Sequence, residues 1–388
     1  MATLLLVIIY AGYISLGIPD SLLGAAWPAI YTDLNLPISY MNFITSVTCV
    51  GTIVMSFLSA RLIKLLGTGR IVVFSTMLTA FALLGFSISD RFIWLCLLAF
   101  PLGLGAGAID TALNNYVAEN YSASHMNFLH CFYGVGVTLS PYVMSLTLKH
   151  LGSWRYGYRI SAVIQLAITL IAVLSLPLWK RVRESKPEAF ETEIVPFKKL
   201  LGDPEVRAVT LAFMFSVSIE CICSSWGSTF LVNAKGYSVD AAAGLITFYY
   251  IGLTMGRFCS GVFAKWLSCW QLIFYGAFFT LGAIVVFILP LPPAFSALAL
   301  FLIGFGNGPV FPNLTHLTPR HFGSARSGSI IGFEMSFVYV STLLTPVIFG
   351  LLAQYVSIWL FAPCLIAAFI AFILAAARFK KFDNNKTK

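Results

Sequence analysis

Four carboxylic acids lie within long apolar stretches of this 388-residue sequence: Asp20, Asp110, Glu220 and Glu334. An acid at membrane depth costs roughly 2.5–3.5 kcal/mol, so it is retained where it faces a partner or a water-filled cavity. The chemistry open to such side chains is the binding and release of a proton, or the recognition of a polar ligand. These four acids are therefore the first candidates for function.

Asp110 lies in the middle of FPLGLGAGAIDTALNNYVAE, which covers Phe100–Glu119. On a helix, Gly103, Gly107, Asp110 and Asn114 form one stripe, and its small residues allow a neighbouring helix to approach closely. A desolvated carboxyl group exchanges its proton nearer to physiological pH than an exposed one does. We favour a proton-coupling role for Asp110 over the alternative, a structural hydrogen-bond network with the neighbouring asparagines.

Asp20 follows a helix-breaking Gly-x-Pro in the stretch GIPDSLLGAAWP. An acid next to proline often serves a local backbone role at a kink. The stretch continues apolar on both sides, which favours a carboxylate that faces a cavity. Asp20 and Asp110 are therefore the predicted proton-coupling pair.

A set of neutral polar side chains follows in SASHMNFLHCFYGVGVTLSP. Helical spacing places Asn127 and His130 on one face, with Tyr133 beside them. Amide and imidazole groups bond hydroxyls while an aromatic ring packs on apolar faces, so the set suits a hydroxyl-rich ligand. The sequence leaves open whether His130 binds a ligand or packs in the core.

The second half of the chain has fewer polar candidates. Glu220 is a ligand acceptor or a second titrating group, and Trp226 is a ligand contact or an interface anchor. Glu334 is a possible second titrating group that either faces the cavity or pairs with Arg257. The predicted substrate-binding residues are Asn114, Asn127, His130, Tyr133, Glu220, Trp226 and Asn307.

Composition identifies the elements that must position these residues. Hydrophobic residues make up 59% of the chain and charged residues 10%, against about 25% charged in soluble proteins. The apolar runs are continuous over about 20 residues, which predicts an all-α membrane protein and excludes a β-barrel. The twelve expected spans are 3–31, 38–66, 70–89, 92–118, 124–150, 157–180, 205–233, 239–265, 268–289, 295–317, 325–354 and 356–379.

The chain divides into two similar halves. We expect a six-helix bundle at 1–180, a cytoplasmic linker at 181–204, a second six-helix bundle at 205–380 and a cytoplasmic tail at 381–388. The Asp110 stretch aligns without a gap with FLIGFGNGPVFPNLTHLTPR, where Phe311 stands at the place of Asp110. A helix of this kind therefore forms without the acid. Two parallel six-helix repeats are the architecture of major facilitator transporters.

Basic residues predict the orientation of the chain. Of the 24 Lys and Arg residues, 18 fall on the side of the termini and linker and five on the other, so both termini are expected to be cytoplasmic. The net charge of +9 thus lies at helix ends and does not indicate nucleic acid. The sequence lacks nucleotide-binding, catalytic and metal-ligand motifs. We expect a monomeric, multi-pass protein of the cell membrane, neither an enzyme nor cofactor-dependent, driven by a proton gradient.

Four motifs resemble the fucose–galactose–glucose:proton symporter branch of the major facilitator superfamily: PDSLL, AIDTALNNYV, MNFLHCFYGVG and IECICSSWGSTFL. The resemblance implies that Asp20 and Asp110 match the coupling acids of that branch, and that Asn127, His130 and Tyr133 line its sugar site. The chain departs from the superfamily pattern in SARLIKLLGTGR, which has no acid before its basic residues. Glu334 and the cysteine-rich seventh span also differ, so the sugar stays open.

The leading hypothesis is a proton-coupled symporter of a sugar or similar polyhydroxylated small molecule that works by alternating access. One alternative is an exporter, antiporter or flippase of amphipathic or lipid-linked compounds, which the many aromatic residues would suit. Another is a membrane receptor that binds a ligand without transporting it. The receptor hypothesis leaves Asp20 and Asp110 without a role.

Overall fold

The computed structural model describes residues 2–37, 40–185, 193–237, 239–289, 291 and 293–386. The chain forms two compact units. The first unit comprises Met1–Tyr116, Leu129–Ile194 and Gly323–Ser336, and the second comprises Val117–Phe128, Val195–Phe322 and Phe337–Lys388. Each unit is therefore built mainly from one half of the chain, with one short helical segment from the other half.

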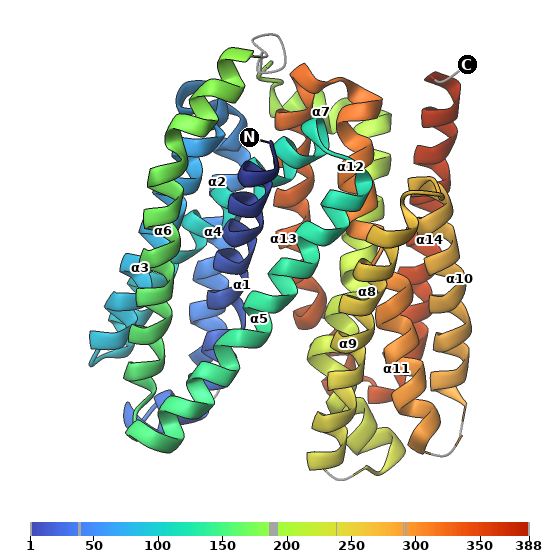
Figure 1. Ribbon diagram of the computed structural model, residues 1–388. Helices are drawn as coiled ribbons and strands as arrows, with labels where there is room; N and C mark the ends of the chain where they lie inside the picture. Colours follow the sequence, from blue (N-terminus) through green and yellow to red (C-terminus); the bar gives the residue numbers. More distant parts are fainter. Residues whose placement is uncertain are drawn as a thin grey trace. The chain divides into compact units, whose positions relative to one another are not determined.

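Long helices make up both halves of the sequence (Figure 1). The first half contains α1 (Ala2–Asp33), α2 (Met41–Leu66), α3 (Thr68–Ile88), α4 (Phe92–Asn120), α5 (Ala123–Leu151) and α6 (Trp154–Ser185). The second half contains α7 (Phe197–Gly202), α8 (Pro204–Lys235), α9 (Val239–Phe263), α10 (Cys269–Ile288), α11 (Pro293–Asn307), α12 (Val310–Phe322), α13 (Ser324–Tyr355), the 3₁₀ turn η3 (Ile358–Leu360) and α14 (Phe361–Lys386).

Ten membrane-spanning candidates occur among the described residues, by length and hydropathy; α11 and α12 together form one of them. The expected tenth span, 295–317, is therefore two helices rather than one. The break lies at Gly308 and Pro309. A proline ring removes one backbone donor and clashes with the carbonyl four residues earlier, which interrupts a helix.

Glycines allow close helix contacts in both units. A Cβ on Gly103 of α4 would collide with the backbone oxygen of Thr48 on α2. A Cβ on Gly304 of α11 would collide in the same way with the backbone oxygen of Tyr249 on α9. Gly103 and Gly304 are partners in the sequence repeat, so the glycine stripe sets the same helix crossing twice.

The linker and the tail are more helical than the sequence suggested. Helix α6 continues to Ser185, and α14 continues to Lys386 through most of the expected tail. Lys and Arg are good helix formers, so a basic segment can extend an apolar span into water. The linker also contains the short helix α7. Residues 186–192 of the linker lie outside the described residues.

The start of α13 packs within the first unit. Ser327 donates a hydrogen bond to Asn115 of α4 at 2.7 Å. Gly332 has no side chain, so its backbone can pack against the carbonyl of Ser56 on α2. The backbone N–H of Glu193 donates to the carbonyl of Ala325 at 2.6 Å, which joins the end of the linker to the same segment.

Candidate functional site

Asp110 is buried inside the first unit, with 6% of the residue exposed. The hydroxyl of Tyr13 on α1 donates a hydrogen bond to its Oδ1 at 3.0 Å. The amide of Asn114, one turn along α4, donates to the same oxygen at 2.9 Å. A charge-assisted hydrogen bond is the strong kind, so two donors compensate part of the cost of burying this carboxylate.

Asp20 has a different environment. Its side chain is exposed, and its Oδ2 accepts a hydrogen bond from the hydroxyl of Tyr133 at 2.7 Å. Helices α1 and α5 approach closely beside it, because Gly17 contacts the Tyr133 carbonyl and Gly136 contacts the Ile14 carbonyl. Without a Cβ at either crossing position, the Tyr133 hydroxyl can reach the Asp20 carboxylate.

The two acids stand at the ends of one line of polar side chains. Tyr13 and Asp20 are seven residues apart on α1, so they share a face about 10 Å apart along the axis. The ring of His130 on α5 packs edge-to-face on Tyr13 with centroids 5.3 Å apart, and Tyr133 follows one turn later. We call Asp110, Tyr13, His130, Tyr133 and Asp20 the polar track.

The sequence analysis missed Tyr13. A tyrosine in an apolar helix is ordinary in a membrane protein, and its partner Asp110 is 97 residues away. One signal was present: the seven-residue spacing places Tyr13 on the helix face of Asp20.

The two predicted asparagines have different surroundings. Asn114 is fully buried and belongs to the Asp110 network. Asn127 is also fully buried, and its amide donates to the backbone carbonyl of Ala123 in its own helix at 2.8 Å. Asn127 falls in the segment of α5 that belongs to the second unit. Its role in substrate binding stays a prediction.

The second unit has an apolar contact at the place of the Tyr13–Asp110 hydrogen bond. Phe311, the counterpart of Asp110, packs edge-to-face on Phe213 of α8 with centroids 5.1 Å apart. Phe213 precedes Glu220 by seven residues, as Tyr13 precedes Asp20. An aromatic pair thus stands where the first unit has a tyrosine bonded to an acid.

Glu220 is half-buried on α8 and interacts electrostatically with Arg257 of α9. Arg257 is itself buried, with 8% exposure. The sequence analysis also considered Arg257 as a partner for Glu334, and that pairing stays a prediction. Glu334 is fully buried, in the part of α13 that belongs to the first unit.

Trp226 and Asn307 both hold helices together. The indole N–H of Trp226 donates to the Pro346 carbonyl at 3.0 Å. The side-chain oxygen of Asn307 accepts from the Ser216 hydroxyl at 2.9 Å, and its amide donates to the Ser216 carbonyl at 3.2 Å. A substrate could therefore bind to Asn307 only if it replaced these hydrogen bonds to Ser216 of α8.

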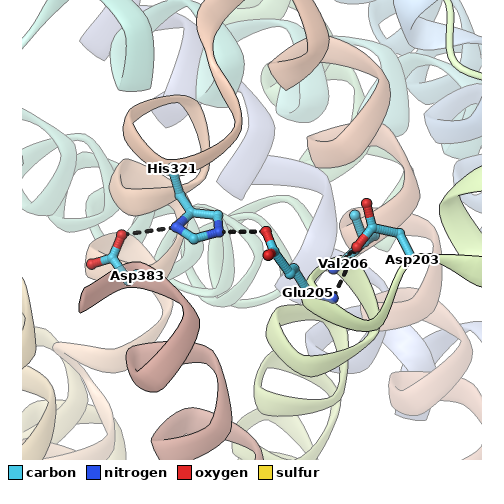
Figure 2. A network of polar contacts seen from close by, with 5 residues as sticks. All are labelled: Asp203, Glu205, Val206, His321 and Asp383. Atoms are coloured by element: carbon cyan, nitrogen blue, oxygen red, sulfur yellow. Dashed lines mark hydrogen bonds and ion pairs between the residues drawn. The ribbon is translucent and has the colours of Figure 1, made fainter. Parts of the chain in front are cut away.

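A separate charged cluster lies at the ends of α8, α12 and α14 (Figure 2). His321 is bonded through Nε2 to Glu205 and through Nδ1 to Asp383, each at 2.9 Å. Trp270 donates to the second oxygen of Asp383 at 2.7 Å. The sequence analysis did not single out this cluster. Within the described residues, no group of three or more His, Cys, Asp or Glu side chains is arranged to hold a metal ion.

Helix order, repeated glycine crossings and a buried acid in one repeat define a polytopic helical protein of two related six-span halves. The model of the Major Facilitator Superfamily matches residues 9–346. The chain belongs to this superfamily, and it is a multi-pass membrane transporter. The predicted fold class and the resemblance to this superfamily are confirmed.

Individual relatives are distant. The chain is 20% identical over 314 residues to the glucose/mannose transporter GlcP of Bacillus subtilis (strain 168), covering 78% of this chain and 77% of that one. The proton:xylose symporter XylE has a TM-score of 0.76 at 13% identity, covering 95% of this chain and 94% of its own. FucP in its outward conformation has a TM-score of 0.74 at 15% identity, covering 95% and 98%. At this identity, the two structures establish the shared fold.

Proposed function

We propose that this chain is a proton-coupled symporter of a sugar or a similar polyhydroxylated small molecule. The observation that carries the proposal is Asp110, a buried acid bonded to Tyr13 and Asn114. Its repeat counterpart is Phe311, packed on Phe213. The second half of the chain forms the same helix with Phe311 at this position, so the fold does not require an acid there. The cost of burying Asp110 is therefore best explained by function.

Protonation of Asp110 is the coupling step in this proposal. The buried acid binds a proton from one side of the membrane. Once the carboxyl group is neutral, the substrate-loaded carrier can close its site to that side and open it to the other. Asp20, exposed and bonded to Tyr133, receives or relays the proton at the other end of the polar track. An inward proton is worth about 2.3 kcal/mol per 100 mV, which can drive accumulation of the substrate.

His130 and Tyr133 are the substrate contacts best placed for coupling, because both also belong to the polar track. A hydroxyl-rich ligand bound to Tyr133 would compete for its hydrogen bond to Asp20, and one bound to His130 would alter the ring contact with Tyr13. The names of GlcP, XylE and FucP support a sugar substrate, and those of XylE and FucP include proton symport. We further propose a monomer in the cell membrane with both termini cytoplasmic.

One alternative is transport of amphipathic or lipid-linked compounds, as an exporter, antiporter or flippase. An apolar cavity of about 470 Å³ between α9, α10 and α11 favours it, with Phe263, Phe279 and Phe305 among its walls. The described residues that line this cavity include no acid, so it offers no group for proton coupling. A receptor without transport activity would bind ligand and fail to exchange it across the membrane.

The test uses purified protein in proteoliposomes with labelled D-glucose, D-mannose, D-xylose or L-fucose. We expect wild-type protein to accumulate one of them under an inward proton gradient and to exchange it without a gradient. Asp110→Asn should lose accumulation and retain exchange, because only coupling needs the titratable acid. Asp90→Asn, an exposed acid outside the polar track, is the matched control. Full accumulation by Asp110→Asn would disprove the coupling role.

The same preparation separates the alternatives. Thermal stabilisation by amphiphiles with no response to any sugar would favour the exporter hypothesis. Sugar binding without exchange would favour a receptor.

A further inference from the structure

Glu220 on α8 is the repeat counterpart of Asp20 on α1. Each acid follows an aromatic residue by seven positions, Tyr13 in the first half and Phe213 in the second. The polar partners of the first half, Tyr13 and Asp110, both correspond to phenylalanine in the second half. Of the two acids and the tyrosine between them, the second half therefore keeps only the acid at Glu220.

Arg257 of α9 supplies the charge that balances Glu220. It is buried, with 8% exposure, and the two side chains attract one another electrostatically. In the described part of the second unit, the other titratable side chains that interact with Glu220 are Cys223, Tyr249 and Tyr250. Thiols and phenols of ordinary acidity are neutral at pH 7. Arg257 is thus the cation that keeps Glu220 ionised.

The fold does not require an arginine at position 257. Gly252 of α9 packs closely against α11, as Gly51 of α2 packs against α4, and this correspondence aligns α9 with α2. In the alignment, Ser56 stands at the place of Arg257. A small residue therefore serves at this position in the first half. The cost of burying a guanidinium group in the second half is best explained by its effect on Glu220.

The Glu220 carboxylate has acceptor capacity for a ligand. Asp20 and Asp110 accept hydrogen bonds from side chains of the first unit. Glu220 is half-buried, and no described residue donates a hydrogen bond to it. An ionised carboxylate offers about four lone-pair sites. Glu220 can therefore accept a hydrogen bond from a ligand without losing one from the chain.

An aromatic ring and a further donor lie on the facing helix. Tyr250 and Arg257 are seven residues apart on α9, so they share a helix face. The Tyr250 residue is 44% exposed, whereas the Nε of Arg257 is buried and has no hydrogen-bond partner among the described residues. A ring beside a charged acceptor suits a sugar, because the apolar face of the sugar packs on the ring while its hydroxyls bond to the polar groups.

We propose that Glu220 accepts a hydrogen bond from a hydroxyl group of the transported substrate, and that Arg257 is the positioning residue that keeps this acceptor ionised. The proposal rests on the proposed function, because it concerns the same polyhydroxylated substrate. It decides between the two roles that the sequence analysis left open for Glu220. Glu220 is a permanent acceptor, and proton coupling belongs to the acids of the polar track.

The first experiment needs no substrate. Infrared spectra of the protein in liposomes are recorded between pH 8 and pH 6, and subtracting the spectrum of the matched Glu220→Gln variant isolates the Glu220 signal. At pH 7 we expect an ionised carboxylate in wild type and in Arg257→Lys. Arg257→Gln should convert part of the signal to a neutral carboxyl group, since a neighbouring positive charge favours the ionised form. Arg207→Gln, at an exposed position of α8, is the matched control and should behave as wild type does.

The second experiment uses whichever of the four labelled sugars the wild-type protein exchanges, together with the monodeoxy forms of that sugar. We expect loss of one particular hydroxyl to raise the half-saturating concentration about tenfold in wild type, as for a lost hydrogen bond to a charged group. In Glu220→Gln the same change should have less than about a twofold effect. The maximal exchange rate and gradient-driven accumulation should stay near wild type in Glu220→Gln, because the acid carries no proton.

The outcomes separate this inference from the proposed function. A wild-type protein that exchanges none of the sugars would overturn the proposed function and this contact with it. Exchange in which wild type and Glu220→Gln depend equally on every hydroxyl would overturn the contact alone. Loss of accumulation with full exchange in Glu220→Gln would make Glu220 a proton carrier instead.

The role of Arg257 stands on the spectra. Identical spectra for wild type and Arg257→Gln would show that Arg257 does not hold the charge of Glu220. A melting curve in detergent verifies that each variant folds. The double variant E220Q/R257Q leaves neither charge without its partner, so it replaces Glu220→Gln in the exchange assay if the single variant does not fold.

Discussion

The Tyr13 hydroxyl and the Asp110 carboxylate form a hydrogen bond of 3.0 Å between α1 and α4. At the corresponding place in the second unit, the rings of Phe213 and Phe311 pack together 5.1 Å apart. The repeat therefore contains its own comparison, in which one copy of a helix contact is polar and the other is apolar. The polar copy is the one to which we assign proton coupling.

Tyr13→Phe is the most direct test of this pair. The substitution keeps the aromatic ring and removes the hydroxyl that donates to Asp110. The Phe213–Phe311 pair of the second unit shows that a phenylalanine fits at such a helix contact. We expect gradient-driven accumulation to fall roughly tenfold, because a hydrogen bond to a charged group contributes about 1.5–3 kcal/mol. The melting temperature should change little.

Tyr10→Phe is the control for that experiment. Tyr10 lies one turn earlier on α1 and stacks on Phe132 at 4.6 Å. Its variant should accumulate substrate as wild type does. Unchanged accumulation in Tyr13→Phe would show that the hydroxyl has no part in coupling.

The fold could be predicted because its signals are local and repeated. Continuous apolar runs, a single charged linker and two copies of a glycine-rich stretch are all visible in the sequence. Asp110 could be found for the same reason, since an acid within an apolar run is conspicuous and its repeat partner is Phe311. The break at Gly308 and Pro309 was also visible, yet the apolar composition on both sides suggested one continuous span.

The contacts of the site could not be predicted in the same way. Tyr13 reaches Asp110 across 97 residues of sequence, and nothing in either segment specifies the other as its neighbour. Asn307 is a predicted substrate contact, and nothing in the sequence indicated that its side chain bonds to Ser216, 91 residues away. The sequence shows which side chains are polar, but their bonding partners are determined by how the helices pack.

Gly103→Ala tests whether the glycine stripe is structural. A Cβ there meets the backbone oxygen of Thr48, which cannot move aside as a flexible side chain can. We expect the free energy of unfolding to fall by about 1–3 kcal/mol, the usual range for overpacking. A thermal melt in detergent measures it.

Gly24→Ala on α1 is the matched control, since no atom lies within 4 Å of the added Cβ. This variant should melt at or slightly above the wild-type temperature because alanine has the higher helix propensity. Equal melting temperatures for Gly103→Ala and Gly24→Ala would contradict the close crossing of α2 and α4.

Asp33 provides a prediction about pH. It lies beyond the apolar part of α1, and the hydrogen bond from Arg155 holds its pKa below the ordinary value. A lowered pKa in the folded state stabilises the protein above the unfolded pKa, and this contribution is lost as pH falls through the folded pKa. Asp33→Asn should therefore melt below wild type at pH 7, by an amount corresponding to about 0.2–1 kcal/mol for this partly exposed pair.

That difference should shrink as the pH is lowered below about 4, where the carboxyl group also protonates in wild type. Melting curves of both proteins between pH 7 and pH 3.5 measure it, with Asp90→Asn as the control. A difference that stays constant over this range would show that the charge of Asp33 is not involved.

His321 holds three helix ends of the second unit together. Both of its ring nitrogens contact carboxylate oxygens at 2.9 Å, on Glu205 of α8 and Asp383 of α14 (Figure 2). Replacing this ring therefore removes two contacts to carboxylates at once. The His321 side chain is fully buried, while those of Glu205 and Asp383 are 26% and 17% exposed.

His321→Gln should lower the free energy of unfolding by about 1–3 kcal/mol, because the amide cannot bond to both carboxylates as the ring does and leaves a partly buried acceptor unpaired. The same substitution in a Glu205→Gln background should cost less, since one of those acids is then neutral. A double-mutant cycle from four melting curves measures this coupling. If the two substitutions were additive, His321 would act through packing against Phe322 and Phe379, whose rings lie 4.6 and 5.0 Å from it, and the charge network would not be what joins α8, α12 and α14.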